Sequence, residues 1–149
     1  MPLFSAKLDY ALRAVVDLAM QPPNEACQSR EIAARQDIRG PYLDQILAVL
    51  KREGIVRSIR GAGGGYTLAR SASRISVGEI VRAVVGGQLL VGSNAAAVEP
   101  GARGAAYVVR TFAERTEKQL RDDLDRVLLS DLVSQKRQLD ESLSIMPDI

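Results

Sequence analysis

The chain contains no histidine, no tryptophan and only one cysteine, Cys27, among its 149 residues. Without histidine, no Ser-His or Cys-His nucleophile pair can be built, which argues against an enzyme. One thiol and no imidazole cannot supply a cysteine/histidine metal site, so we expect no metal and no cofactor. A single cysteine also excludes an intramolecular disulfide. This fits a reducing compartment, and we expect a cytoplasmic protein.

Long apolar runs and aromatic side chains are also scarce. No run approaches the roughly 20 apolar residues of a membrane-spanning helix, so no membrane partner is expected. Charges at Lys7, Asp9 and Arg13 within an amphipathic N-terminal pattern argue against a signal peptide. Four tyrosines and two phenylalanines are the only aromatic residues, so aliphatic side chains must build the core.

Positive charge is concentrated in one segment. The net charge is only +2, but residues 51–74 hold six basic side chains and one carboxylate, whereas residues 75–149 hold nine basic and eleven acidic ones. A local basic stripe on a nearly neutral protein fits contact with a polyanion at one place. On charge alone, a solvated basic turn explains the stripe equally well.

Three short helices are expected in the first third of the chain. Residues 5–20 place apolar side chains at helical spacing behind Ser5, a favourable N-cap. Ser29 is expected to cap a second, shorter helix. Pro41 suits the first turn of a third helix, which Gly54 ends as a C-terminal glycine.

A basic hairpin is expected directly after these helices. Two β-type runs, residues 55–59 and 66–68, flank a tip with four glycines in five positions. These glycines permit positive φ and close approach of the backbone to another surface. Arg57 and Arg60 lie on the first arm. Three helices followed by such a hairpin predict a winged helix-turn-helix DNA-binding domain.

The glycine-rich tip does not match a nucleotide-binding motif. Residues 61–65 are not followed by Lys-Ser or Lys-Thr, so they do not form a P-loop. Tyr66 occupies the last position of a G-x-G-x-x-G pattern, which therefore fails as well.

Helix is expected again beyond the hairpin. Ser76 and Glu79 form a capping-box pair for a short helix. Residues 88–105, rich in Gly, Ala, Ser, Asn and Pro without periodicity, predict a flexible loop. Residues 106–129 predict a long amphipathic helix, and Ser130 is expected to cap a last one.

The expected fold class is mainly α with a small β-hairpin wing. We expect a winged helix-turn-helix domain over residues 1–87, a flexible loop over 88–105 and dimerisation helices over 106–149. A long amphipathic helix with nothing left in the chain to cover it needs a partner, most simply a second copy in a two-fold homodimer. The alternative is that this helix folds back on its own N-terminal domain. The residues expected at the dimer interface are Val109, Phe112, Thr116, Leu120, Leu124, Val127 and Leu128.

Candidate DNA contacts follow from the helix-turn-helix geometry. The second helix of the pair enters the major groove with its first turns toward the bases, where Tyr42 and Gln45 share a face. Glutamine can bond adenine at N6 and N7, and an arginine such as Arg60 suits a narrow A·T-rich minor groove. Each residue also has an explanation without DNA: Tyr42 as a cover over the core, Gln45 as a solvated surface residue, and Arg60 as an exposed arginine without a partner. The remaining candidates lie beside the helix or on the hairpin: Arg39, Lys51, Arg57, Gly61, Gly63 and Gly64.

Several segments together resemble a known family. They are residues 6–14, 31–33, 42–47, 50–70 and 75–84, and the Gly-Ala-Gly-Gly-Gly-Tyr wing at 61–66 is highly specific. They resemble the Rrf family of bacterial winged-helix regulators (Rrf two type). The resemblance extends over about residues 3–140.

The resemblance implies a homodimer whose long helices cross and whose two winged domains read a palindromic promoter site. It places Tyr42 and Gln45 at recognition-helix positions and Arg60 at the wing position that enters the minor groove. It also places Ser5 and Lys7 at N-terminal contacts with the DNA backbone.

The sequence departs from the family at several positions. Arg39 stands where many relatives have a capping serine, and Pro41 where they often have a charged residue. Many relatives hold an iron–sulfur cluster through three cysteines in the loop after the fourth helix, but residues 88–105 contain none. Asp9 matches a ligand position in the nitric-oxide-sensing members, yet one carboxylate without thiolates will not hold a cluster. We therefore expect no cluster, and a buried hydrophobic role for Cys27.

Two functions follow from this sequence. The first is a homodimeric transcriptional regulator, most simply a repressor, that binds double-stranded DNA. Its signal is left open among a small-molecule effector, a protein effector, oxidation of Cys27, and no signal at all. The alternative is a protein-interaction regulator on the same scaffold. It would dock a metabolic enzyme or another partner through the 88–105 loop and the last helix.

Overall fold

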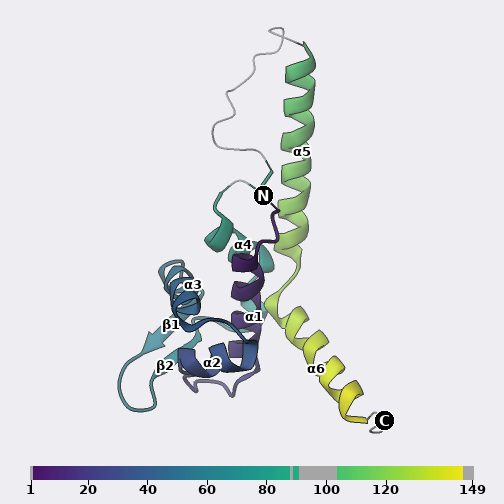
Figure 1. Ribbon diagram of the computed structural model, residues 1–149. Helices are drawn as coiled ribbons and strands as arrows, with labels where there is room; N and C mark the ends of the chain where they lie inside the picture. Colours follow the sequence, from purple (N-terminus) through teal and green to yellow (C-terminus); the bar gives the residue numbers. More distant parts are fainter. Residues whose placement is uncertain (1, 88, 91–103, 146–149) are drawn as a thin grey trace.

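The computed structural model describes residues 2–87, 89–90 and 104–145. In this part of the chain, three helices precede a hairpin and three follow it, which confirms the expected fold class (Figure 1). Most of the predicted 88–105 loop lies outside the described residues. The elements are α1 (Ala6–Met20), α2 (Ser29–Gln36), α3 (Gly40–Arg52), β1 (Val56–Ile59), β2 (Gly65–Leu68), a 3₁₀ turn η1 (Ala72–Arg74), α4 (Val77–Val85), α5 (Gly104–Arg126) and α6 (Leu129–Ile145).

Two of the predicted serine caps are present. The Ser5 hydroxyl accepts the N–H of Leu8 at 3.3 Å, and the Ser76 hydroxyl accepts the N–H of Glu79 at 3.1 Å. Each satisfies one of the free donors at a helix start. The Glu79 carboxylate binds the guanidinium of Arg70 instead of reaching back to Ser76.

The other two predicted serine caps are wrong, because each serine already lies inside its helix. α2 starts at Ser29 itself, behind Gln28, whose side chain makes no capping bond. α6 starts one residue before Ser130. There the Asp131 carboxylate accepts the N–H of Leu128 at 2.9 Å, which is the acidic half of a capping box.

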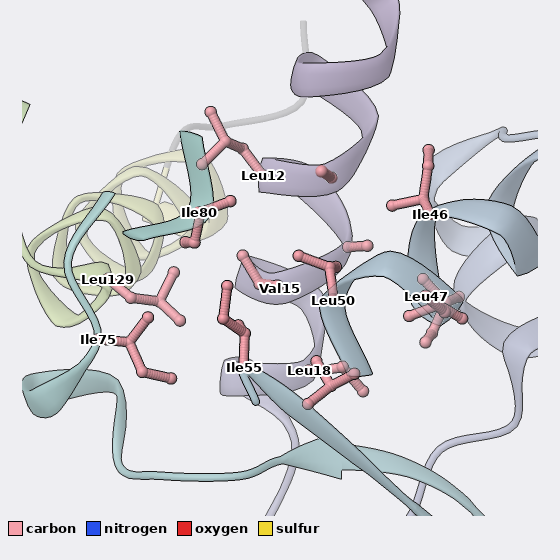
Figure 2. Close-up of a cluster of buried hydrophobic side chains, with 14 of the residues drawn as sticks. Leu12, Val15, Leu18, Ile46, Leu47, Leu50, Ile55, Ile75, Ile80 and Leu129 are labelled. Carbon is pink, nitrogen blue, oxygen red and sulfur yellow. The ribbon is translucent and has the colours of Figure 1, made fainter. Parts of the chain in front are cut away.

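The core is aliphatic, as the low aromatic content predicts. Figure 2 shows α1 side chains between those of α3 on one side and those of α4 and α6 on the other. Burial of this apolar surface is the main favourable term in folding. The largest fully buried side chains are Leu8, Val15, Ile32, Leu43, Ile46, Leu47, Leu50, Ile55, Val56, Ile75, Ile80 and Leu129.

The junction between α5 and α6 belongs to this same core. Leu129 is completely buried and points toward Ile75 and Ile80 in Figure 2. Its N–H donates to the carbonyl of Ile75 at 2.8 Å, and the N–H of Val77 donates to the carbonyl of Val127 at 2.8 Å. Through these bonds the C-terminal helices are fixed to the segment that starts α4.

The long helix α5 is only partly covered by its own chain. Its C-terminal half packs against α4, and its N-terminal half projects beyond the body (Figure 1). Val108, Val109 and Phe112 on the projecting half are about two-thirds exposed, at 65%, 64% and 65%. In the covered half, the buried Glu117 carboxylate accepts the backbone N–H groups of Leu89 and Leu90.

Candidate nucleic-acid interface

Helix α3 separates an apolar face from a polar one. Leu43, Ile46, Leu47 and Leu50 recur at helical spacing and are buried, so the opposite face must be exposed. Gln45 lies on that exposed face, as predicted. Its neighbours there include Asp44 and Ala48, which the sequence reasoning did not single out. An aspartate on this face can accept a hydrogen bond from cytosine N4.

Tyr42 occupies the first turn of α3 but is only half exposed. Its ring meets that of Tyr10 edge to face, with centroids 5.6 Å apart and planes at 84°. The Arg13 guanidinium lies over the Tyr10 ring, 4.8 Å from its centroid. These contacts give Tyr42 a packing role beside α1, whether or not it also reaches DNA.

The hairpin is a two-stranded antiparallel wing. Arg57 pairs with Thr67 and Ile59 with Gly65, which leaves residues 60–64 as the tip. Within the tip, the N–H of Gly64 donates to the carbonyl of Gly61 at 2.9 Å. Gly63 has φ +76°, the value that the third position of a type II turn requires. The glycine at position 63 therefore allows the tight turn at the tip of the wing.

Two of the wing glycines are needed for close packing. A Cβ on Gly65 would lie 2.4 Å from the carbonyl oxygen of Cys27, and one on Gly64 would lie 2.3 Å from that of Ile59. Gly65 also has φ +144°. This close approach lets Cys27 and Tyr66 exchange two backbone hydrogen bonds of 2.8 Å. Gly64 is buried by the turn, whereas Gly61 and Gly63 are exposed with open space around them.

A polar cluster around buried Asp17 and Cys27 holds α2 against α1. The Arg35 guanidinium donates to both carboxylate oxygens of buried Asp17, at 2.9 and 2.7 Å, and contacts the Cys27 sulfur at 2.8 Å. The Gln36 amide adds a third donor to Asp17 at 2.9 Å. Burial raises the pKa of the Cys27 thiol, a rise that Arg35 opposes and the Glu31 carboxylate reinforces.

Among the described residues, five of the nine cations without a carboxylate partner lie on the helix-turn-helix and the wing. In α5 and α6 most basic side chains pair with an acidic one three or four positions away, for example Lys136 with Asp140 at 2.6 Å. Around α3 and the wing most do not. Within the described ranges, the basic side chains that form no ion pair are Lys7, Arg30, Arg39, Lys51, Arg57, Arg60, Arg74, Arg115 and Arg137.

Most predicted DNA-contact residues lie around α3 and the wing tip. Three of them lie elsewhere or are engaged in other contacts. Arg57 lines a groove between the wing and α6, and Lys7 is half-buried. The Ser5 hydroxyl is already committed to capping α1. The structure adds Arg30, an exposed side chain at the start of α2 that lines a shallow hollow with Gly61. Arg30 lies in the first turn of the first helix of the helix-turn-helix, and this position could have indicated an exposed cation from the sequence alone.

The predicted dimer residues are divided between two environments. Val109 and Phe112 lie on the projecting half of α5 and are largely exposed, whereas Leu124 packs against the core of its own chain. Thr116 donates its hydroxyl hydrogen bond to the carbonyl of Phe112, one turn earlier. Leu120 and Leu128 are half-buried, and Val127 is 36% exposed.

A family comparison identifies this arrangement. The Rrf2 family model, described as an iron-dependent transcriptional regulator, matches residues 4–135. The chain belongs to the Rrf2 family. The resemblance predicted from the sequence is thereby confirmed, and the family is one of regulators, not enzymes, as predicted.

Relatives and solved structures support the same assignment. The chain is 49% identical over 82 residues to the regulator IscR of Cereibacter sphaeroides, covering 54% of this chain and 53% of the relative. It is 31% identical over 136 residues to IscR of Pectobacterium carotovorum, covering 91% and 82%. For the first of these and for a Synechocystis relative, the match spans about half the relative's length.

Two solved Rrf2-type structures share most of the fold. The global cysteine regulator CymR of B. subtilis superposes with a TM-score of 0.69 at 29% identity, over 91% of this chain and 98% of that one. IscR of T. potens also gives a TM-score of 0.69, at 32% identity over 97% and 92%. No helix among the described residues is long and apolar enough to cross a membrane.

The residues of this Rrf2 chain do not fit an iron–sulfur cluster. The 149 residues supply one thiol and no imidazole. That thiol, Cys27, is buried against Arg35 and Glu31 at the base of the wing. Asp9 pairs with Arg13 at 3.4 Å. Among the described residues, no three histidine, cysteine, aspartate or glutamate side chains form a group that could hold a metal ion.

Proposed function

We propose that this Rrf2 chain is a cytoplasmic, homodimeric repressor that binds a palindromic promoter site without an iron–sulfur cluster. The observation that carries the proposal is the distribution of cations without carboxylate partners. Arg39, Lys51 and Arg60 are exposed around the polar face of α3 and the tip of the wing. Cations that no carboxylate neutralises are free to replace the counterions of DNA phosphates.

The exposed apolar side chains on the N-terminal half of α5 support the homodimer. Val108, Val109 and Phe112 form an exposed apolar strip on a helix that projects from the body. Pairing of two such strips about a two-fold axis would bury both of them. A two-fold dimer would present α3 and the wing twice, in opposite directions. Such a pair matches a palindromic site, with half-sites spaced by a whole number of helical turns.

Repression needs only that the dimer occupies the promoter, and independence from iron needs only that the chain holds no cluster. A dimer that occupies a promoter excludes other proteins from it, so no further activity is needed for repression. With one thiol and no imidazole, the chain lacks the usual ligands of an iron–sulfur cluster, which supports a regulator that works without one. Anaerobic loading that gave stoichiometric iron and a visible chromophore would contradict this part of the proposal.

Replacement of the wing arginine tests DNA recognition. Because a narrow A·T-rich minor groove focuses negative potential, Arg60→Ala should weaken binding most at duplexes whose flanks are A·T-rich. Arg115→Ala is the matched control, since Arg115 is exposed and forms no described ion pair but lies on α5. Fluorescence anisotropy with both variants and both kinds of flank gives the comparison. Equal affinities for wild type and Arg60→Ala would remove Arg60 from the interface.

A further inference from the structure

A groove between the base of the wing and α6 has a cationic lining that the proposed DNA interface does not explain. Its volume is about 500 Å³, and its walls include Arg57 and Thr67 from the wing, Arg70 beside η1, and Ser134 and Arg137 from α6. Of the described residues that line it, none is an aspartate or a glutamate. The chain has eighteen acidic residues against twenty basic ones, so such a lining is unusual here.

Two of the three arginines have charge available for a ligand. Arg70 is occupied, because it binds the Glu79 carboxylate at 2.5 Å and the carbonyl of Arg74 at 2.7 Å. Arg57 and Arg137 make no ion pair with any residue that the structure describes. Next to Arg137, Lys136 takes the nearby carboxylate of Asp140, at 2.6 and 2.7 Å.

The other groups of the groove suit the same kind of ligand. Hydroxyls of Thr67, Ser130 and Ser134 add neutral donors beside the guanidinium groups. Leu18 and Val133 add apolar surface to the walls. A guanidinium donates two parallel hydrogen bonds to a phosphate or a carboxylate, and hydroxyls complete the shell of such an oxyanion. A volume of this size holds a small metabolite.

We propose that this groove binds a small organic anion, a phosphate or carboxylate group on a short apolar body. The occupant would contact β1 and β2 on one side and α6 on the other, so its binding would link the wing to the C-terminal helices. If the proposed DNA-binding function holds, the anion is an effector that shifts the wing's affinity for DNA by its differential contacts. The binding itself does not depend on that function.

Titration of the full chain without DNA tests the site. Phenyl phosphate and benzoate serve as phosphate and carboxylate probes, benzyl alcohol as the uncharged control, all at constant ionic strength, with calorimetry and amide NMR shifts as readouts. We expect saturable binding of an anionic probe, with shifts at Thr67 and Ser134. Because each guanidinium contact is charge-assisted, Arg137→Gln and Arg57→Gln should each weaken binding roughly tenfold or more. Arg115→Gln, which removes an exposed arginine outside the groove, should leave binding unchanged.

The outcomes separate this site from the DNA interface. Absence of saturable binding, or equal loss in Arg115→Gln, would overturn the anion site while leaving DNA binding untouched. If DNA displaces the probe and Arg137→Gln weakens DNA of every sequence equally, the groove is instead a contact for the DNA backbone. If the probe binds but operator affinity stays the same, the site stands and its effector role is refuted.

Discussion

At the scale of single residues, the wing depends on glycines that differ in purpose. Gly61 and Gly63 have positive φ in open space at the tip. Gly64 and Gly65 instead lie where any side chain would collide with backbone oxygen. One motif therefore combines turn geometry with close packing. The sequence predicted positive φ and close approach to another surface, but not that Gly64 and Gly65 approach backbone oxygens of this same chain.

Gly65→Ala should destabilise the protein by about 1–3 kcal/mol, the usual cost of a strained backbone position. The added Cβ would meet the carbonyl oxygen of Cys27 at 2.4 Å, and the residue would keep φ +144°. Gly87→Ala is the control, since Gly87 has open space and no positive φ. Urea unfolding measures both. Equal free energies of unfolding for the two variants would refute the packing role of Gly65.

Cys27 predicts how stability should depend on alkaline pH. Burial raises the pKa of its thiol above the ordinary value, so the native state holds the proton more tightly than the unfolded state. Its contribution to stability is present below the ordinary thiol pKa of about 8.5 and is lost as pH rises through the native value. The free energy of unfolding should thus fall more steeply above this pH for wild type than for Cys27→Ala. Parallel curves in urea titrations across that range would contradict the prediction.

At the scale of elements, α5 changes its role along its length. Its C-terminal half belongs to the folded body, where Glu117 binds the backbone of Leu89 and Leu90. Its N-terminal half exposes apolar side chains (Figure 1). One part of this helix therefore folds back on its own chain, which is one of the alternatives that the sequence left open. The exposed part is the surface that we propose for a second copy.

Phe112→Glu should weaken the homodimer at least roughly tenfold, because buried aromatic anchors dominate interfaces and a carboxylate is costly there. Lys118→Glu is the control, since it adds a carboxylate to the same helix at an exposed position on a different face, six residues from Phe112. Sedimentation equilibrium gives the dissociation constants. A wild-type protein that stays monomeric, or equal constants for both variants, would refute this interface.

The helices and wing could be predicted because their limits are marked locally. Pro41, Gly54 and the wing glycines act on the backbone at their own positions. The caps predicted at Ser29 and Ser130 were also local choices, but α2 already includes Ser29 and α6 already includes Ser130. Several features could not be foreseen, because each depends on segments far apart in sequence. Examples are the burial of Leu129 against Ile75 and the packing of Leu124 on its own core.

The candidate site was predictable to a similar extent. The exposed position of Gln45 follows from the spacing of buried leucines and isoleucines on α3. The contact of Tyr42 with Tyr10, and the place of Arg57 beside α6, depend on how separate elements pack. Such packing also decides which cations find a carboxylate, which composition alone does not reveal.

At the scale of the whole molecule, the C-terminal helices and the region of α3 and the wing differ in how many of their cations form ion pairs. The C-terminal helices pair most of their cations within themselves, whereas Arg39, Lys51, Arg57 and Arg60 near α3 and the wing form no ion pair with any described residue. Such an arrangement predicts strongly salt-dependent DNA binding. With about six to ten phosphate contacts, affinity should fall roughly 10³- to 10⁵-fold between about 50 and 200 mM salt.

Selection of bound duplexes from random DNA tests the central claim most directly, because it reports sequence preference and symmetry together. A two-fold dimer that reads DNA with α3 and the wing predicts enriched inverted repeats with A·T-rich steps where Arg60 reaches the minor groove. Recovery of duplexes without a shared sequence, or of single half-sites without symmetry, would contradict the account.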